Sequence, residues 1–291
     1  MKKSCILFGA SGFIGSHVLN ILKKREFNVI ASDIKKNKWT KDDSKFIETD
    51  ILNYSKLNKI QNKTDYFLIF SAISDIEESN SNPLKTLNVN VIGLINILNL
   101  AVKLKVKKII FASTIYVNSN EGGIYKVTKL AGEELIKEFK KNHNLDFTII
   151  RYGSVYGPRS GLNNGIYKIL NNALVNKKLQ YFGSKDTLRE YIHVIDAAES
   201  TIDLIDDKYN NQIITLTGKE STKVQDLLLL IKDIMSIKSK IKFLNKKIPG
   251  HYIRTPYSFE DKLSKKYSPQ LNIDLAEGLV QTLNYIKKQK N

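Results

Sequence analysis

A glycine-rich turn directly after a short apolar run is the feature that most restricts the fold of this chain. Ile6-Leu7-Phe8 leads into Gly9-Ala10-Ser11-Gly12-Phe13-Ile14-Gly15, and a helical pattern follows over residues 13–24. The three glycines allow a tight turn, a close approach of backbone to a pyrophosphate, and close packing of the helix on the sheet. A glycine turn that only permits packing is the alternative. The context favours a dinucleotide site, whose contacts we place at Gly9, Ser11, Gly12, Phe13, Ile14 and Gly15.

A carboxylate at the end of the next strand indicates which dinucleotide is bound. The apolar run 28–32 ends in Asp33, eighteen residues after Gly15. A carboxylate there accepts hydrogen bonds from the adenosine ribose hydroxyls and repels a 2′-phosphate, so NAD is favoured over NADP. Lys35 and Lys36 follow closely and could weaken that repulsion.

Strand-like and helical patterns alternate through the first half of the chain. Strands are predicted at 4–8, 28–32, 66–70, 107–112 and 146–151, and helices at 13–24, 55–61, 84–104 and 124–142. This alternation predicts an α/β fold with a Rossmann-type doubly wound parallel sheet. The rhythm changes after Gly157-Pro158. We therefore expect an NAD-binding domain over 1–158 and a smaller C-terminal α/β substrate-binding lobe over 159–291, with segments near 191–218 able to return to the first domain.

Composition restricts the classes of partner. The 291 residues carry a net charge of +17, but the lysines are spread along the chain without a basic block interleaved with aromatic residues, so no nucleic-acid partner is expected. No apolar run approaches ~20 residues and no leader pattern begins the chain, so a soluble, cytoplasmic protein with no membrane contact is expected. Cys5 is expected to be a small buried hydrophobe, and the four histidines are scattered, so no metal site is predicted.

Tyr125 and Lys129 are the candidate catalytic pair. They are four residues apart in a predicted helix and therefore share a face, and a lysine ammonium there should lower the pKa of the phenol from ~10. The strand 107–112 runs into Ser113-Thr114, eleven residues before Tyr125. Thr114 is the hydroxyl that we expect to orient a substrate hydroxyl and stabilise charge on its oxygen. A surface helix carrying an incidental tyrosine and lysine is the alternative.

Further short motifs follow one another in order. They are Asp50-Ile51, Ser71-Ala72, Asn90-Val91-Ile92-Gly93, Ser113-Thr114, Tyr125-Lys126-Val127-Thr128-Lys129, the run 151–159 and the run 189–198. With the glycine motif, they resemble the nucleotide-sugar epimerase/dehydratase family of extended short-chain dehydrogenases/reductases, and specifically its UDP-glucose 4-epimerase-like members. The resemblance implies cofactor contacts at Asp50, Ile51, Ser71, Ala72, Asn90, Tyr125, Lys129 and Tyr152, although Tyr152 also fits an ordinary core tyrosine.

The resemblance also implies a nucleotide-diphosphate sugar as substrate. Arg189 is the candidate partner of the diphosphate and Arg254 a second one, because a guanidinium fork matches phosphate oxygens. Each arginine could instead be a solvated surface charge. Thr114 is a candidate substrate contact, and Ser154 stands where relatives often have asparagine, which leaves one sugar-nucleotide contact in doubt.

Departures from the family pattern restrict the reactions that the chain is expected to catalyse. The dehydratases place an Asp-Glu pair directly after the catalytic threonine, whereas Ile115-Tyr116 follows Thr114 here, which argues against 4,6-dehydration. The loop from Thr114 to Tyr125 is short and has Asn118 where a tyrosine is usual, so we expect an open site.

An NAD-dependent epimerase acting at C4 of a UDP-, GDP- or dTDP-linked sugar, in surface polysaccharide or glycoconjugate synthesis, is therefore the expected function. A net nucleotide-sugar dehydrogenase or keto-reductase and a non-catalytic NAD(H)-binding regulator are the alternatives. The resemblance further implies a homodimer formed by the helices at 84–104 and 124–142. The candidate dimer-face residues, which could equally face the sheet, are Leu94, Leu98, Leu130, Leu135 and Ile136.

Overall fold

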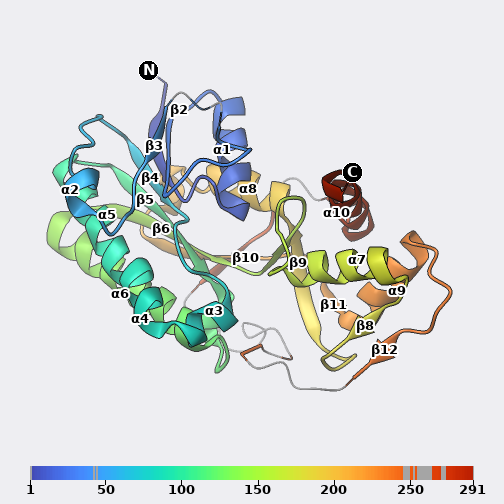
Figure 1. Ribbon diagram of the computed structural model, residues 1–291. Coiled ribbons are helices and arrows are strands. Elements are labelled where there is room, and N and C mark those ends of the chain that lie inside the picture. The colour runs from blue at the N-terminus through green and yellow to red at the C-terminus, as the bar shows by residue number, and fades with distance from the viewer. Residues whose placement is uncertain are drawn as a thin grey trace.

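A parallel sheet of eight strands forms the centre of the molecule (Figure 1). The computed structural model describes residues 2–41, 43, 45–244, 250–251, 253, 264–269 and 273–290. The strand order is β13-β10-β6-β5-β4-β1-β2-β3, and every pairing in it is parallel. The predicted α/β fold with a Rossmann-type doubly wound sheet is confirmed. The strands are β1 (Ser4–Phe8), β2 (Asn28–Asp33), β3 (Phe46–Glu48), β4 (Tyr66–Ile69), β5 (Lys108–Thr114), β6 (Asp146–Tyr152), β10 (Gln212–Leu216) and β13 (Lys265–Tyr267).

Helices cover both faces of this sheet because its strands are apolar on both sides. On one face, α1 (Phe13–Lys24) and α8 (Val194–Asp203) pack in one core cluster with side chains such as Leu7. On the other face, α5 (Gly93–Lys103) and α6 (Gly123–His143) pack in a second cluster with side chains such as Phe8. Cys5 is buried in the first cluster, as expected for a small hydrophobe.

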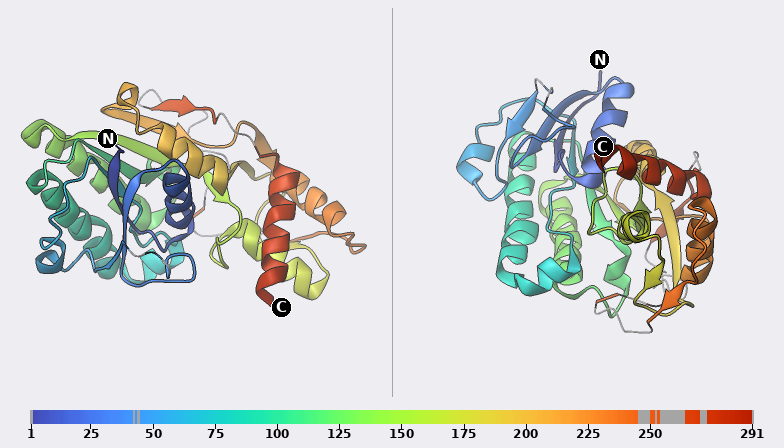
Figure 2. Two further views of the ribbon diagram at one scale, coloured as in Figure 1. Left: turned by 90° about the horizontal axis from the view of Figure 1, so that it is seen from above. Right: turned by 45° about the vertical axis from the view of Figure 1, so that its right-hand side comes forward.

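A smaller set of elements lies beside the sheet (Figure 2). Its helices are α7 (Gly165–Asn176), α9 (Val224–Ile234) and α10 (Leu275–Lys290), which share a third core cluster. A three-stranded sheet pairs β11 (Ser221–Lys223), β9 (Leu188–His193) and β7 (Ser154–Tyr156), and a two-stranded sheet pairs β12 (Lys242–Phe243) with β8 (Gln180–Tyr181). Because α8, β10 and β13 pack in the large unit, the chain leaves and re-enters it after residue 158, and the two-lobe division stays our interpretation.

Several predicted helices differ from the observed ones in extent. The predicted helix at 84–104 is a continuous run of α4 (Pro83–Leu87), a π-helical turn η1 (Asn88–Ile92) and α5. The predicted helix at 55–61 shortens to α2 (Tyr54–Leu57), and α3 (Ile76–Ser81) and the 3-10 turns η2 (Ile115–Asn118) and η3 (Asp207–Tyr209) were not predicted. The expectation that no apolar run approaches ~20 residues is wrong, because Pro83–Lys103 is long and apolar enough to span a membrane. Its buried side chains pack on the sheet as those of a core helix do.

The candidate dimer-face residues divide between the core and the surface. Leu94, Leu98 and Ile136 are 2%, 0% and 1% exposed and face the sheet, so of the two alternatives the sheet-facing one holds for these three residues. Leu130 is exposed, whereas Leu135 is partly buried against the core. Periodicity alone did not separate the two faces because the helix over 83–103 carries apolar side chains on both.

The backbone contact between Gly9 and Gly15 predicts a large cost for one added methyl group. A Cβ at Gly15 would lie 2.1 Å from the Gly9 carbonyl oxygen, whereas one at Gly165 would meet nothing within 4 Å. We expect Gly15→Ala to lower the free energy of unfolding by about 2 kcal/mol because α1 must move off the sheet. The matched Gly165→Ala should change it by less than about 0.5 kcal/mol. Urea denaturation measures both, and equal values for the two variants would contradict the role given to this contact.

Candidate active site

The glycine turn has the geometry of a phosphate-binding turn. Gly9 has φ +83, and its N–H donates to the Ser32 carbonyl at 2.9 Å. A Cβ at Gly9 would lie 2.5 Å from Ser71 N, so glycine is required there on both counts. The first bond of α1 runs from Ser16 N to Gly12 O at 3.0 Å, which leaves the N–H groups of residues 13–15 without acceptors inside the helix. These features fit a pyrophosphate.

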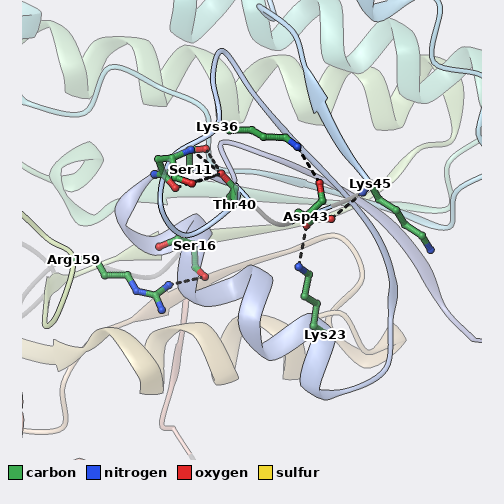
Figure 3. A network of polar contacts seen from close by, with 9 residues as sticks. Ser11, Ser16, Lys23, Lys36, Thr40, Asp43, Lys45 and Arg159 are labelled. Carbon is green, nitrogen blue, oxygen red and sulfur yellow. Dashed lines mark hydrogen bonds and ion pairs between the residues drawn. The ribbon is translucent and has the colours of Figure 1, made fainter.

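Asp33 lies at the end of β2 directly against the glycine turn. One carboxylate oxygen accepts from Ser11 N at 2.9 Å and the other from Ile34 N at 2.7 Å. Burial raises the pKa of Asp33, and these two N–H donors oppose the shift. The ammonium of Lys36 donates to the Asp43 carbonyl at 3.2 Å (Figure 3). Among the described residues, Lys36 forms no ion pair with Asp33, which fits a ribose carrying free hydroxyls.

The other predicted cofactor residues follow β3 and β4. Asp50 is exposed and accepts from Leu52 N at 2.9 Å, whereas Ile51 is buried against Gly93. Ser71 and Ala72 follow β4, and within the described part of the chain the buried Ser71 hydroxyl has no hydrogen-bond partner. An unpaired buried hydroxyl next to the glycine turn fits a site that is completed by a polar ligand.

Asn90 links the cofactor loop to the helix that carries Tyr125. Its Oδ1 accepts from Ile73 N at 2.8 Å, and its Nδ2 donates to Ile73 O at 2.9 Å and to Thr128 Oγ1 at 3.0 Å. Asn90 lies in the π-helical turn, an irregularity that often marks functional positions. The predicted cofactor residue therefore fixes the loop after Ser71-Ala72.

The structure brings Thr114, Tyr125 and Lys129 together at the carboxyl end of β5. The Tyr125 phenol is hydrogen-bonded to the Thr114 side chain. Lys129 Nζ donates to the Ala112 carbonyl at 2.7 Å and lies 5.9 Å from the centroid of the Tyr125 ring. A phenol, a hydroxyl and an ammonium are therefore neighbours at the same edge of the sheet as the glycine turn.

The expected lowering of the Tyr125 pKa is not produced by the surrounding protein groups. Burial raises the pKa of Tyr125 to about 12, and the hydrogen bond with Thr114 opposes the rise. Burial also lowers the pKa of Lys129 to about 8, opposed by the charge of Glu133. Spacing in the sequence predicts that the two groups are neighbours but carries no information on how much water both lose.

A buried ion pair that sequence reasoning missed lies below these residues. Glu133 accepts from Arg151 Nε at 3.0 Å, from Arg151 Nη2 at 2.8 Å and from Ser113 Oγ at 2.6 Å. Arg151 Nη1 also donates to Asn118 Oδ1 at 3.1 Å. The spacing of Glu133 four residues after Lys129 was the available signal, because it places the carboxylate on the same helix face. The network joins β5, α6, β6 and η2 beneath the site.

The predicted residues nearer the substrate are less closely grouped. Tyr152 lies in the core at the strand position next to Thr114, and its hydroxyl shares a 2.5 Å hydrogen bond with that of Thr201. Ser154 begins β7, and Arg189 lies half-buried on β9, where its Nη1 donates to the Leu188 carbonyl at 2.9 Å. Arg254 lies outside the described residues.

The loop that we expected to leave the site open is bridged by a distant segment. Tyr116 Oη and His251 Nδ1 are 2.8 Å apart, and Gly122 N donates to the Gly250 carbonyl at 3.0 Å. Burial lowers the pKa of His251, and the charge of Arg189 adds to the shift. His251 and Tyr116 are 135 residues apart, and no local pattern in the sequence predicted the contact.

Comparison with known proteins gives one family and more than one reaction. The profile described as the NAD dependent epimerase/dehydratase family matches residues 5–215, well over half of the chain. A Methanocaldococcus jannaschii protein provisionally named UDP-glucose 4-epimerase is 28% identical over 306 residues, 97% of this chain and 98% of its own. A UDP-N-acetyl-alpha-D-glucosaminuronate decarboxylase from Bacillus cytotoxicus is 28% identical over 100% of both chains. The solved UDP-glucuronic acid 4-epimerase from Bacillus cereus, in complex with UDP-glucuronic acid and NAD, has a TM-score of 0.85 at 26% identity, covering 98% of this chain and 99% of that one.

The buried ion pair predicts a stability difference between two adjacent glutamates. Glu133→Gln leaves the guanidinium of Arg151 buried without its counter-charge, and we expect the free energy of unfolding to fall by about 3 kcal/mol. Glu134 forms an exposed ion pair with Lys137 at 2.7 Å, so Glu134→Gln should change it by less than about 1 kcal/mol. Urea denaturation of the two variants measures these changes. If Glu133→Gln lowers the free energy of unfolding as little as Glu134→Gln does, the buried ion pair does not stabilise the packing of β5, α6 and β6.

Proposed function

Because this chain belongs to the NAD dependent epimerase/dehydratase family, we propose that it is an NAD-dependent nucleotide-sugar epimerase. The proposed reaction inverts C4 of a UDP-, GDP- or dTDP-linked sugar, in the cytoplasm. The observation that carries the proposal is the grouping of Thr114, Tyr125 and Lys129 at the carboxyl end of β5, at the same edge of the sheet as the glycine turn.

In the proposed mechanism, Tyr125 takes the proton of the reacting sugar hydroxyl and later returns it. When bound, NAD supplies the hydride acceptor and donor and, in its oxidised form, a positive charge near the phenol. The protein groups around Tyr125 hold its pKa at about 12, so they do not by themselves produce a phenolate at neutral pH. A positive charge beside the phenol would favour its deprotonation, and bound NAD would supply such a charge. Lys129 contributes its ammonium, and Thr114 holds the sugar hydroxyl in line with the phenol.

The surroundings of Thr114 support epimerisation over dehydration. Ile115 is buried and apolar, and Tyr116 is hydrogen-bonded to His251. Neither residue after Thr114 carries a carboxylate that removes water across two carbons. Inversion needs only the hydroxyl, the phenol and room for the keto-sugar to turn over.

For substrate binding, we propose that Arg189 pairs with the diphosphate and that Ser154 contacts the sugar nucleotide. Both residues lie on adjacent strands, β9 and β7, which pair in parallel next to the large sheet. Arg254 remains a proposed second phosphate contact on the sequence alone. The smaller lobe, residues 159–291, would then supply most of the substrate contacts.

Substitution of the phenol tests the central role. We expect Tyr125→Phe to lower turnover at least about 100-fold, because general base catalysis contributes 10²–10⁴-fold, while the fold and NAD binding persist. Tyr54→Phe, at an exposed position of α2, serves as the matched control and should keep full activity. The assay incubates the protein with a panel of nucleotide sugars, resolves products by NMR and follows NADH absorbance. Turnover by Tyr125→Phe above about 1% would remove the phenol from its assigned role.

The same assay separates the competing reactions. An inverted sugar without net NADH supports the epimerase and identifies the carbon. Stoichiometric NADH with a keto-sugar indicates a dehydrogenase, and loss of carbon dioxide from a nucleotide-linked uronic acid indicates a decarboxylase like the Bacillus cytotoxicus relative. NAD binding with no turnover on any sugar would favour a non-catalytic NAD(H)-binding regulator.

We also propose a homodimer formed by α4, η1 and α6. These elements lie side by side and expose the apolar side chains Leu84, Leu87, Ile92, Val127 and Leu130. Leu84 is 71% exposed and Val127 is 52% exposed, which is unusual for large apolar side chains grouped on neighbouring helices.

Charges placed on this surface should separate the two copies. We expect the double variant Leu84→Glu/Val127→Glu to sediment as a monomer at concentrations at which the wild type is a dimer, because two charges would be buried unpaired in each copy. Val175→Glu, on the exposed face of α7, should remain dimeric. Sedimentation velocity distinguishes these outcomes, and a double variant that is still dimeric would place the contact elsewhere.

A further inference from the structure

A cluster of aromatic and cationic side chains joins three distant segments beside α1. The Arg159 guanidinium lies over the Trp39 ring with its carbon 4.2 Å from the centroid. The Tyr285 ring of α10 lies 6.0 Å from the Trp39 ring, and Lys38 Nζ is within 4.6 Å of the Trp39 centroid and 5.7 Å of the Tyr285 centroid. Trp39, Arg159, Tyr285 and Lys38 together are called the Trp39 clasp below.

The inner end of the clasp is bound to the glycine turn. Ser11 Oγ donates to the Lys35 carbonyl at 2.8 Å and lies 3.1 Å from Thr40 Oγ1, as Figure 3 shows. Asn37 Nδ2 donates to the Ser11 carbonyl at 2.6 Å, and Trp39 N donates to Asn37 Oδ1 at 2.9 Å. The loop 35–40, which directly follows Asp33 and Ile34, is thus fixed at one end to the turn that would hold the pyrophosphate.

The outer end is fixed by the loop after β7. Arg159 Nη1 donates to the Ser16 carbonyl in α1 at 3.1 Å (Figure 3), and Pro158 O lies 3.0 Å from His17 Nε2. Arg159 adopts φ +70, which costs energy for a residue with a side chain. In the part of the chain that the structure describes, no carboxylate forms an ion pair with it. Stacking on Trp39 and the bond to Ser16 are therefore what hold the guanidinium here.

These contacts suit the loop 35–40 to hold the cofactor in place, an inference that rests on the proposed function. A reaction without net oxidation needs the same reduced cofactor to return its hydride, because early release leaves a keto-sugar behind. We propose that the Trp39 clasp retains NAD by holding the loop 35–40 over the adenosine side of the dinucleotide groove, and that it must open before the cofactor leaves. Since Arg159 and Tyr285 come from segments beyond residue 158, the retaining contact spans both parts of the molecule.

The test measures how fast the protein releases NADH. Wild-type protein and variants are loaded with NADH and mixed with excess NAD, and the loss of bound-NADH fluorescence gives the dissociation rate without any substrate. We expect Trp39→Ala and Arg159→Gly each to raise this rate about tenfold, the effect of losing a partly desolvated cation–ring contact. Arg159→Gly removes the guanidinium while glycine suits the positive φ, so the fold is not at risk from strain.

Lys3→Ala is the matched control. Lys3 Nζ lies 5.9 Å from the centroid of the Tyr66 ring, a cation–ring pair outside the clasp, and its loss should leave the NADH dissociation rate unchanged. Rates for Trp39→Ala and Arg159→Gly within about twofold of wild type would overturn the clasp, as would an equal rise in Lys3→Ala. If the wild-type protein binds no NADH, both the role of the clasp and the proposed function are wrong. If it retains NADH but inverts no sugar, only the proposed function is wrong.

Discussion

The close backbone contacts of Gly9 with Gly15 and Ser71 are the constraint on which the rest of the candidate site depends. A Cβ atom at Gly15 would clash with the Gly9 carbonyl, and a Cβ atom at Gly9 would clash with the Ser71 amide nitrogen. Three segments, the turn, α1 and the end of β4, therefore meet without side chains between them. That closeness allows the helix N-terminus, Asp33 and the Ser71 hydroxyl to contact the common ligand that we propose. The helix that carries Tyr125 is then placed relative to the same point through the bonds of Asn90 to Ile73 and Thr128.

The arrangement near Tyr125 depends on charges that are withdrawn from water. Glu133 and Arg151 neutralise one another in the core, and Glu133 also opposes the shift that burial imposes on Lys129. A buried pair of this kind contributes little net stability, but removal of one member is costly, so it fixes geometry more than it adds free energy. The helix α6 is held by this pair below the site and by the bond from Asn90 to Thr128 beside it.

Local patterns in the sequence predicted the sheet and the three candidate catalytic residues because each depends on short-range rules. Alternating strands and helices with right-handed crossovers leave few topologies, and they bring the ends of β1, β4 and β5 to one edge. The contact between Tyr116 and His251 joins residues too far apart in sequence for any such rule. The same limit applies to Leu94 and Leu98, whose helix is apolar on two sides, and to the pKa of Tyr125, which depends on how much water the folded chain excludes.

The return of the chain to the large sheet has a consequence for how the protein is made. β6 ends at Tyr152, but its outer neighbour β10 begins only at Gln212, after β7, β8, β9, α7 and α8. While the chain leaves the ribosome, β6 is therefore an uncovered sheet edge of seven residues, five of which later pair with β10. Unpaired edges of apolar strands invite pairing between chains. The nascent protein is thus most prone to aggregate during the interval in which β1 to β6 have been synthesised and β10 has not.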